Sequence, residues 1–366
     1  MRSRPTPDAF LLSISSPARP VSAFPGREPH IDSLKVIASQ LIVLHHFAAY
    51  GPLADALEEA SPLLASWFYD YARMAVQVFL VLGGFLAARS LAPNRAARLI
   101  APFRIVLQRF FRLVPAFLAA LVLAIASSQL ARYWLPADFI PGAPTWGEFL
   151  AHAFLLHGVL GVASLSAGVW YVAIDFQLFA MMAVMLWLGR GWAKAGVVGL
   201  MLVSLFYFNR NADFDDWAVY FFGAYGLGAV AYWVARSSRA GWFLSIFTGA
   251  VLVALAVDFR GRIVIALVTA LILGLAQWRR QTQSTAVHLP VPLSDILATL
   301  GGSSYALFLL HFSVLMIGNA LFASLDAPTA SAALPTLLAC WLASLWLSLL
   351  FVRWVEQPLA RLGRRS

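Results

Sequence analysis

Two adjacent histidines lie in an apolar stretch that also carries one lysine. The stretch IDSLKVIASQLIVLHHFAAY covers residues 31–50 and contains Lys35, His45 and His46. At ~100° and ~1.5 Å per residue, Lys35 and His46 share a helix face about 16 Å apart, and His45 points about 100° away. Ionisable groups in a membrane usually face the bundle interior or a wet cavity, where a histidine can act as a general base. The pattern indicates either a reaction site or a histidine that hydrogen-bonds between helices.

A carboxylate and a third histidine could serve the same site. Asp175 lies five residues into the apolar segment VWYVAIDFQLFAMM, and His46 lies five residues before the outer end of its own segment. If the two segments run in opposite directions, both residues lie at similar depth toward the outer side. A carboxylate beside an imidazole fixes its tautomer and stabilises its charged form, so we expect Asp175 to orient His46. His311, in SSYALFLLHFSVL, is a further candidate near mid-membrane, with a purely structural role as the alternative.

Two arginines could bind a phosphorylated substrate. Arg109 and Arg112 in LQRFFRLVP are spaced i, i+3 and share one face at the start of an apolar segment. Paired guanidinium groups suit phosphate recognition, although membrane topology alone also places arginines at a cytoplasmic helix end. With the histidines, they predict an inner phosphate-binding edge and an outer general base. That layout suits a donor with a phosphorylated head and a long arm, and an acceptor hydroxyl at the far end.

The elements that must position these residues are membrane helices. The chain of 366 residues is 61% hydrophobic and 12% charged, whereas soluble domains are roughly 45–50% apolar and 25% charged. Apolar runs of about 20 residues fill the chain after residue 33 and predict an all-α, polytopic transmembrane helix bundle. The net charge of +9 then marks cytoplasmic loops, and no nucleic-acid partner is expected. A single cysteine excludes an intrachain disulfide, and no cluster has metal-site spacing.

Ten apolar runs are predicted to span the membrane. A shorter eleventh run, FLAHAFLLHGVLGVASL at 149–165, carries His152 and His157 and predicts a re-entrant or interfacial helix. The ten runs cover residues 33–51, 70–90, 104–128, 170–189, 194–208, 217–235, 240–257, 261–277, 297–323 and 334–354.

The loop charges predict the orientation. With ten spans, every basic cluster falls on the side of the arginine-bearing N-terminus, and the opposite loops are acidic or mixed. The positive-inside rule makes the basic side cytoplasmic, so both termini are expected there. We expect a disordered tail at 1–30, a membrane domain at 31–358 and a basic cytoplasmic tail at 359–366.

Six motifs in order resemble the acyltransferase-3 family, membrane proteins that O-acetylate bacterial surface polysaccharides, lipopolysaccharide, nodulation factors and some antibiotics. The family's first helix carries a basic residue, ten residues and a histidine, as do Lys35 and His46. Its arginine motif is matched by Arg109, Arg112 and Pro115. The stretches AVQVFLVLGGFLAARSL, VWYVAIDFQLF, SSYALFLLH and VEQPLARL resemble the other four motifs. The resemblance covers nearly the whole chain after residue 30; each motif is loose alone, but six in order are specific.

Four positions depart from the family pattern. Lys35 replaces the usual arginine, Gln77 an aspartate, Gly83 a serine and Asp175 a glutamate. Lysine keeps the charge but loses the bidentate fork, and aspartate keeps the carboxylate on a shorter stem. Gln77 has no charge, so no acidic role is carried over to it. The departures indicate a divergent branch and bear on the acceptor more than on the chemistry.

The resemblance implies an O-acyltransferase of the bacterial inner membrane, active through its membrane domain. The implied donor is acyl-CoA, usually acetyl-CoA, and the implied acceptor is a sugar hydroxyl of an exported polysaccharide or lipid-linked glycan; membrane lipid is a further partner and no metal is expected. Catalysis is expected of His46 supported by Asp175, and donor binding of Arg109 and Arg112 with Lys35 and Arg89. His311 and Glu356, the latter in the terminal motif, are further candidates.

Two other classes of protein remain open at this point. One is a transporter or flippase for a lipid-linked sugar, against which stands the lack of repeated halves and paired broken helices in the sequence. The other is a non-catalytic scaffold of a polysaccharide-export complex. The sequence leaves open the acceptor, the acyl group, the side of transfer, an acyl-enzyme intermediate and the oligomeric state.

Overall fold

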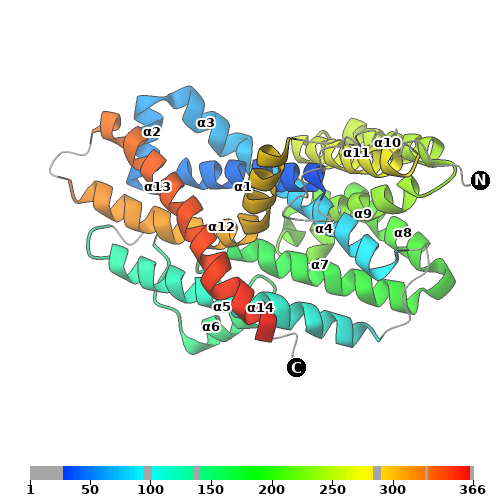
Figure 1. Cartoon of the computed structure of the whole chain (residues 1–366), viewed down its shortest axis with the longest axis horizontal. Helices are drawn as coiled ribbons and strands as arrows, with labels where there is room; N and C mark the ends of the chain where they lie inside the picture. The colour runs from blue at the N-terminus through cyan, green and yellow to red at the C-terminus, as the bar shows by residue number, and fades with distance from the viewer. Residues whose placement is uncertain (1–27, 94–100, 136–139, 283–289, 326–328, 363–366) are drawn as a thin grey trace, which may run out of the picture.

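The computed structural model of the chain is a helical bundle (Figure 1). It describes residues 28–93, 101–135, 140–282, 290–325 and 329–362, and all regular elements in these ranges are helices. Residues 1–27, most of the predicted N-terminal tail, and residues 363–366, half of the predicted C-terminal tail, lie outside the described residues. The predicted all-α fold is confirmed.

Each of the ten apolar runs forms a helix. Their bounds are α1 (Pro29–Phe47), α4 (Val76–Leu91), α5 (Pro102–Ala131), α7 (Val169–Leu188), α8 (Ala193–Phe206), α9 (Ala218–Ala235), α10 (Ala240–Val257), α11 (Gly261–Thr282), α12 (Val291–Ala323) and α13 (Ala330–Phe351). Shorter helices are α2 (Pro52–Ala60), α3 (Pro62–Asp70), α6 (Trp146–Ala153) and α14 (Gln357–Leu362), with a π-helical turn (Val352–Glu356) between α13 and α14.

The predicted number of about ten spans is approximate. In the described part of the chain, eight helical segments are long and apolar enough to cross a membrane, or nine if α1 and α2 are one bent span. Of the ten, α1 qualifies only together with α2, and α8 falls short in either count. The 14 residues of α8 extend about 21 Å, against a hydrocarbon core of about 30 Å. It packs against α7 and α9.

The run at 149–165 does not span the membrane. It contributes the second half of α6, and the chain then follows turns until α7 begins at Val169. A capping box starts α6: the Thr145 N–H donates to Glu148 Oε2 at 2.7 Å, and the Glu148 N–H donates to Thr145 Oγ1 at 3.3 Å. The segment is therefore a short helix with a turn-rich continuation, as its length predicted.

A side chain of α12 holds the sharp bend between α1 and α2. The two helices meet at 96° around Gly51, which has φ +82°, a conformation that glycine adopts without strain. Asn319 accepts the Leu53 N–H at 2.9 Å and donates to the Tyr50 carbonyl at 3.2 Å. Because α1 also packs along α12, the two histidines near the end of α1 are fixed relative to α12.

Glycines let α4 and α9 cross with their backbones in contact. A Cβ at Gly84 would meet the Tyr225 carbonyl oxygen, and one at Gly228 would meet the Val81 carbonyl oxygen. Small residues at helix crossings allow this close approach in membranes. The result is a nearly fully buried α9 and a fixed α4, whose first turn brings Gln77 to the pocket described below.

Candidate active site

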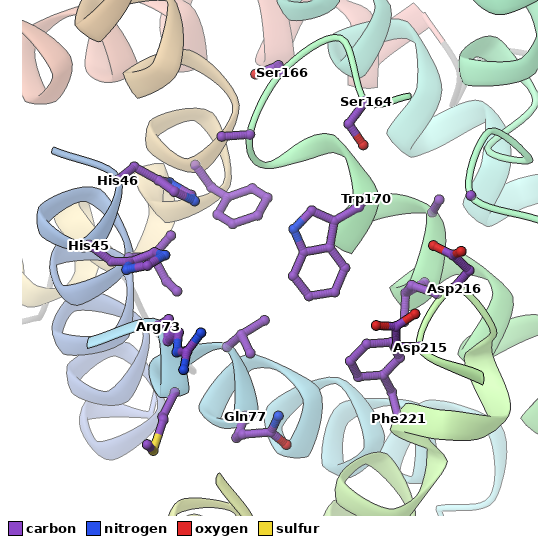
Figure 2. Close-up of a pocket in the computed structure, with 18 of the residues that line it drawn as sticks. His45, His46, Arg73, Gln77, Ser164, Ser166, Trp170, Asp215, Asp216 and Phe221 are labelled. Carbon is purple, nitrogen blue, oxygen red and sulfur yellow. The ribbon is translucent and has the colours of Figure 1, made fainter. Parts of the chain in front are cut away.

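A pocket of about 880 Å³ lies among α1, α4, α7, α12 and the loops before α7, α9 and α11 (Figure 2). Its size is in the range of small-molecule sites, roughly 300–1,000 Å³. Two helices each turn one stripe toward it. From α1 the stripe is Ile42, His45 and His46, and from α7 it is Trp170, Ala173, Ile174 and Gln177, spaced i, i+3, i+4, i+7.

His46 of α1 forms a hydrogen bond to His311 of α12 at the pocket wall. His46 Nδ1 and His311 Nε2 are 2.6 Å apart, and the rings lie at 10° to each other with centroids 4.8 Å apart. His311 is fully buried, whereas His46 is 7% exposed and its ring points into the pocket (Figure 2). The structure thus joins two candidates that are 265 residues apart in the sequence.

The hydrogen-bond partners determine which nitrogens carry protons. His311 Nδ1 lies 3.0 Å from the Leu307 carbonyl, which can only accept, so this nitrogen carries the hydrogen. In a neutral His311, Nε2 is then the acceptor and takes the hydrogen bond from His46 Nδ1–H. His46 Nε2 is left with its lone pair. The chain of bonds from Leu307 through His311 therefore presents His46 as a base.

His45 has a different partner. Its Nδ1 donates to the Phe68 carbonyl of α3 at 3.2 Å, and its half-buried ring also lines the pocket. The predicted 100° rotation places it next to His46, with ring centroids 5.1 Å apart, and its hydrogen bond goes to α3 rather than to α12. His45 is thus an interhelical hydrogen-bonding residue, but the rotation does not keep it out of the pocket, which both histidines line.

The expectation that Asp175 orients His46 is wrong. Asp175 Oδ2 accepts a hydrogen bond from Arg109 at 2.5 Å, while the polar partner of His46 is His311. The reason lies in the stripe of α7: Ile174 and Gln177 face the pocket, and Asp175 points about 100° away from Ile174. Similar depth in the membrane did not mean the same face.

The same contact changes the interpretation of Arg109. Its guanidinium also lies over the Phe179 ring, 4.3 Å from the centroid, so it is held inside the bundle by α7. Gly83 of α4 leaves room for the carboxylate, since a Cβ there would be 2.9 Å from Asp175 Oδ1. The pair is largely but not fully buried, with side chains 18% and 15% exposed, and removing one partner from a buried pair costs about 3–5 kcal/mol. Arg109 is therefore engaged in the fold rather than presented at an edge for a phosphate.

The other candidates lie outside the pocket lining. Arg89 pairs with Glu28 at 3.2 Å, and Arg280 pairs with the same carboxylate. Arg112 interacts electrostatically with Glu356. Lys35 is half-buried on the His46 face of α1, near the opposite end of the helix. Arg89 of α4 and Arg280 of α11, joined through Glu28 before α1, form a separate basic region, whereas Arg112 lies on α5.

Several pocket residues escaped sequence reasoning. Arg73, Trp170 and Asp216 lie around the pocket in Figure 2, and His157 lines it from the loop before α7. The available signal was weak: Trp170 belongs to a family-like motif, and His157 is one of two histidines in a short apolar run. Other pocket residues, such as Ser164, Ser166 and Asp215, come from loops whose contacts no periodicity predicts.

The sequence matches the model of a protein family described as an acyltransferase domain over residues 28–353, nearly the entire chain. The chain belongs to the acyltransferase-3 family. Its long apolar helices fit a multi-pass membrane protein, so we describe it as a polytopic membrane acyltransferase. The matched range includes all the residues discussed above as candidates except Glu356.

One curated relative is the Regulator of hypoxia-inducible factor 1 from Caenorhabditis elegans. It is 25% identical over 182 residues, which is 46% of this chain and 36% of that protein. The chain thus spans about a third of the length of this relative. No solved structure matches the chain.

Proposed function

We propose that this acyltransferase moves an acyl group, preferentially acetyl, from cytoplasmic acyl-CoA to a sugar hydroxyl of an exported polysaccharide or lipid-linked glycan. The site would lie in the bacterial inner membrane with both termini cytoplasmic. The observation that carries the proposal is the His46–His311 pair at the wall of an 880 Å³ pocket. A histidine whose unprotonated Nε2 points into a pocket is suited to take a proton from a bound hydroxyl.

The reaction follows from this geometry. His46 Nε2 takes the hydroxyl proton as the acceptor oxygen attacks the thioester carbonyl carbon. A C–O bond forms, the carbonyl π pair moves to its oxygen, and collapse of that intermediate breaks the C–S bond. The imidazolium of His46 then returns its proton to the departing CoA thiolate, which restores the base. Such positioned base catalysis typically contributes about 10²–10⁴-fold in rate.

His311 would act through His46 and not on the substrate. By accepting the Nδ1–H of His46, it keeps the lone pair on Nε2 and holds the ring toward the pocket. It also stabilises the imidazolium that forms when His46 takes the proton, because a hydrogen bond to a charged donor is stronger than one to a neutral donor. His311 is therefore a positioning residue, and takes over the role expected for Asp175.

The basic region supports donor binding at the opposite end of the bundle. Arg89 and Arg280 have side chains 42% and 50% exposed, with one shared carboxylate at Glu28. Guanidinium groups in this setting suit phosphates of CoA. Arg89 is twelve residues from Gln77 on α4, or about 18 Å along the helix. The long arm of CoA would have to bridge this separation to bring the thioester to the pocket. We assign Lys35 and Arg112 to donor binding at the same end of the bundle, and we no longer assign donor binding to Arg109.

A test uses the full chain purified in detergent, with radiolabelled acetyl-CoA and the detergent-solubilised glycan fraction of its host's membranes. The wild type should transfer label to carbohydrate, His46→Ala should transfer none, and His45→Ala should keep part of the activity. Normal insertion and elution of both variants is the control. A flippase or a scaffold would produce no labelled glycan in any sample, and full activity of His46→Ala would overturn the assignment of the base.

A further inference from the structure

A third histidine of the pocket is buried without a hydrogen-bond partner. His157 is 1% exposed and lines the pocket, and within the described part of the chain neither its Nδ1 nor its Nε2 has a hydrogen-bond partner. Leaving a buried donor or acceptor unpaired costs free energy comparable to a lost hydrogen bond. Such a group at a pocket wall calls for a ligand that completes its bonding.

The neighbouring histidine is fully engaged and serves as the support for His157. His152 Nδ1 donates to the Glu148 carbonyl at 2.8 Å, and its Nε2 accepts the Leu165 N–H at 3.2 Å. The two imidazole rings are parallel within 3°, with centroids 4.1 Å apart. Because His152 is fixed by both nitrogens, the stacked ring of His157 is fixed in orientation as well.

The backbone on either side of His157 is also tightly determined. Leu155 has φ +59°, rare for a non-glycine residue, and its carbonyl accepts a hydrogen bond from Gln177 of α7 at 3.0 Å. The Leu156 N–H to Ala151 carbonyl bond closes α6 as a Schellman motif around Leu155. The Val162 N–H to His157 carbonyl bond, at 2.8 Å, closes a second such turn. Strained, over-determined backbone of this kind is found at binding sites.

The surroundings favour a neutral, hydroxyl-rich ligand at this wall. Burial, together with His152, lowers the pKa of His157 to about 4, so the imidazole is neutral and offers one N–H donor and one acceptor nitrogen. Gly158 lies next to Asp216, whose carboxylate accepts hydrogen bonds and repels anions. The nearby arginines Arg260 and Arg262 are bonded to the Asn209 side chain and backbone. A hydroxyl can both accept from and donate to a neutral imidazole.

We propose that His157 is an acceptor-binding residue whose ring nitrogens hydrogen-bond hydroxyl groups of the sugar and hold it against the pocket wall that carries Asp216. This wall lies across the pocket from His45 and His46 in Figure 2. Trp170 lies between the two sides and offers an aromatic face for a sugar ring (Figure 2). The inference rests on the proposed function and adds to it the residue that selects the acceptor.

The experiment measures separate kinetic constants for the two substrates. The purified full chain is assayed with labelled acetyl-CoA and the solubilised glycan fraction of host membranes, each varied in turn, for wild type, His157→Leu and His157→Asn. We expect His157→Leu to raise the KM for the glycan at least tenfold and to leave the KM for acetyl-CoA within twofold. His157→Asn, which keeps a donor and an acceptor, should recover part of the loss. Leu160→Ala, in the same turn with its side chain exposed and outside the pocket, should match the wild type.

Three outcomes would overturn the proposal. An unchanged glycan KM in His157→Leu shows that His157 does not contact the acceptor. An equal loss in His157→Leu and His157→Asn, with unchanged KM values and a lower folded fraction, shows a structural role only. A wild-type protein that labels no glycan, in a preparation where all variants are equally silent, removes the proposed function itself and this inference with it.

Discussion

The role of His311 can be tested by a single substitution. His311→Leu replaces the imidazole by an apolar side chain and removes the acceptor of the His46 Nδ1–H bond. His46 would then be free to carry its proton on Nε2, the nitrogen that must be unprotonated to act as the base. We expect kcat to fall while the KM for acyl-CoA stays near the wild-type value, because His311 lies away from the basic region and contacts the substrate only through His46.

The magnitude follows from the strength of the bond. A hydrogen bond to a group that becomes charged contributes about 1.5–3 kcal/mol. Since about 1.36 kcal/mol changes a rate tenfold, His311→Leu should lower kcat by about 10- to 150-fold. His311→Gln should lose less, because its amide oxygen can accept from His46 and its NH₂ can donate to the Leu307 carbonyl.

The assay is acetyl transfer to glycan by purified variants, with the elution volume and thermal unfolding of each as the measure of folding. His45→Leu is the matched control, because it removes the neighbouring histidine and its bond to Phe68 but not the His46–His311 bond. It should keep kcat within a few fold of wild type. If folded His311→Leu keeps kcat within threefold, or if the Gln and Leu variants are equally impaired, the tautomer argument is wrong.

Three further outcomes are expected. Asp175→Asn should leave the buried Arg109 charge unpaired and destabilise the fold by about 3–5 kcal/mol. The unfolding temperature should fall and the activity should follow the folded fraction. An unchanged unfolding temperature would contradict this. Gly228→Ala should prevent the close approach of α4 and α9 and abolish folding, whereas Gly249→Ala should be tolerated because the space around this glycine is open. A stable Gly228→Ala protein would contradict the close backbone contact of α4 with α9. Folding lowers the pKa of His157 from 6.5 to about 4, so between these pH values the unfolded chain binds a proton that the folded chain does not, and the stability present above pH 6.5 is lost as the pH falls toward 4. The unfolding temperature should therefore drop more from pH 7 to pH 5 for the wild type than for His157→Leu. Equal drops would refute this.

The helices and their order could be predicted from the sequence because the membrane leaves few alternatives. Backbone polar groups in hydrocarbon must be satisfied within the segment, so each long apolar run forms a helix. The run at 149–165 could be distinguished from the membrane spans because it is too short to cross the hydrocarbon core. The run that forms α8 is apolar enough to predict a membrane span, but its helix has only 14 residues and is too short to cross the hydrocarbon core.

The partners of the polar side chains could not be predicted. Helical periodicity gave the rotation of His45 relative to His46, and each found a different partner. For Asp175 the same periodicity gives its rotation relative to its neighbours on α7, but it does not predict which face of α7 turns to the pocket. Apart from Asp175 and Gln177, the side chains of that helix are apolar or aromatic all round, so no continuous polar stripe marks its orientation in the bundle.

The class of protein, the helices, and the depth of the polar groups on each helix all follow from the order of the amino acids. Only the tertiary structure shows that His46 hydrogen-bonds to His311, that Arg109 pairs with Asp175, and that His157 lies at the pocket wall. The physical reason is that these choices depend on the rotation and lateral neighbours of each helix. In a bundle those are set by close packing between helices, as at Gly84 and Gly228. Small residues can mark a helix face that packs closely, but their spacing does not say which helix lies against it.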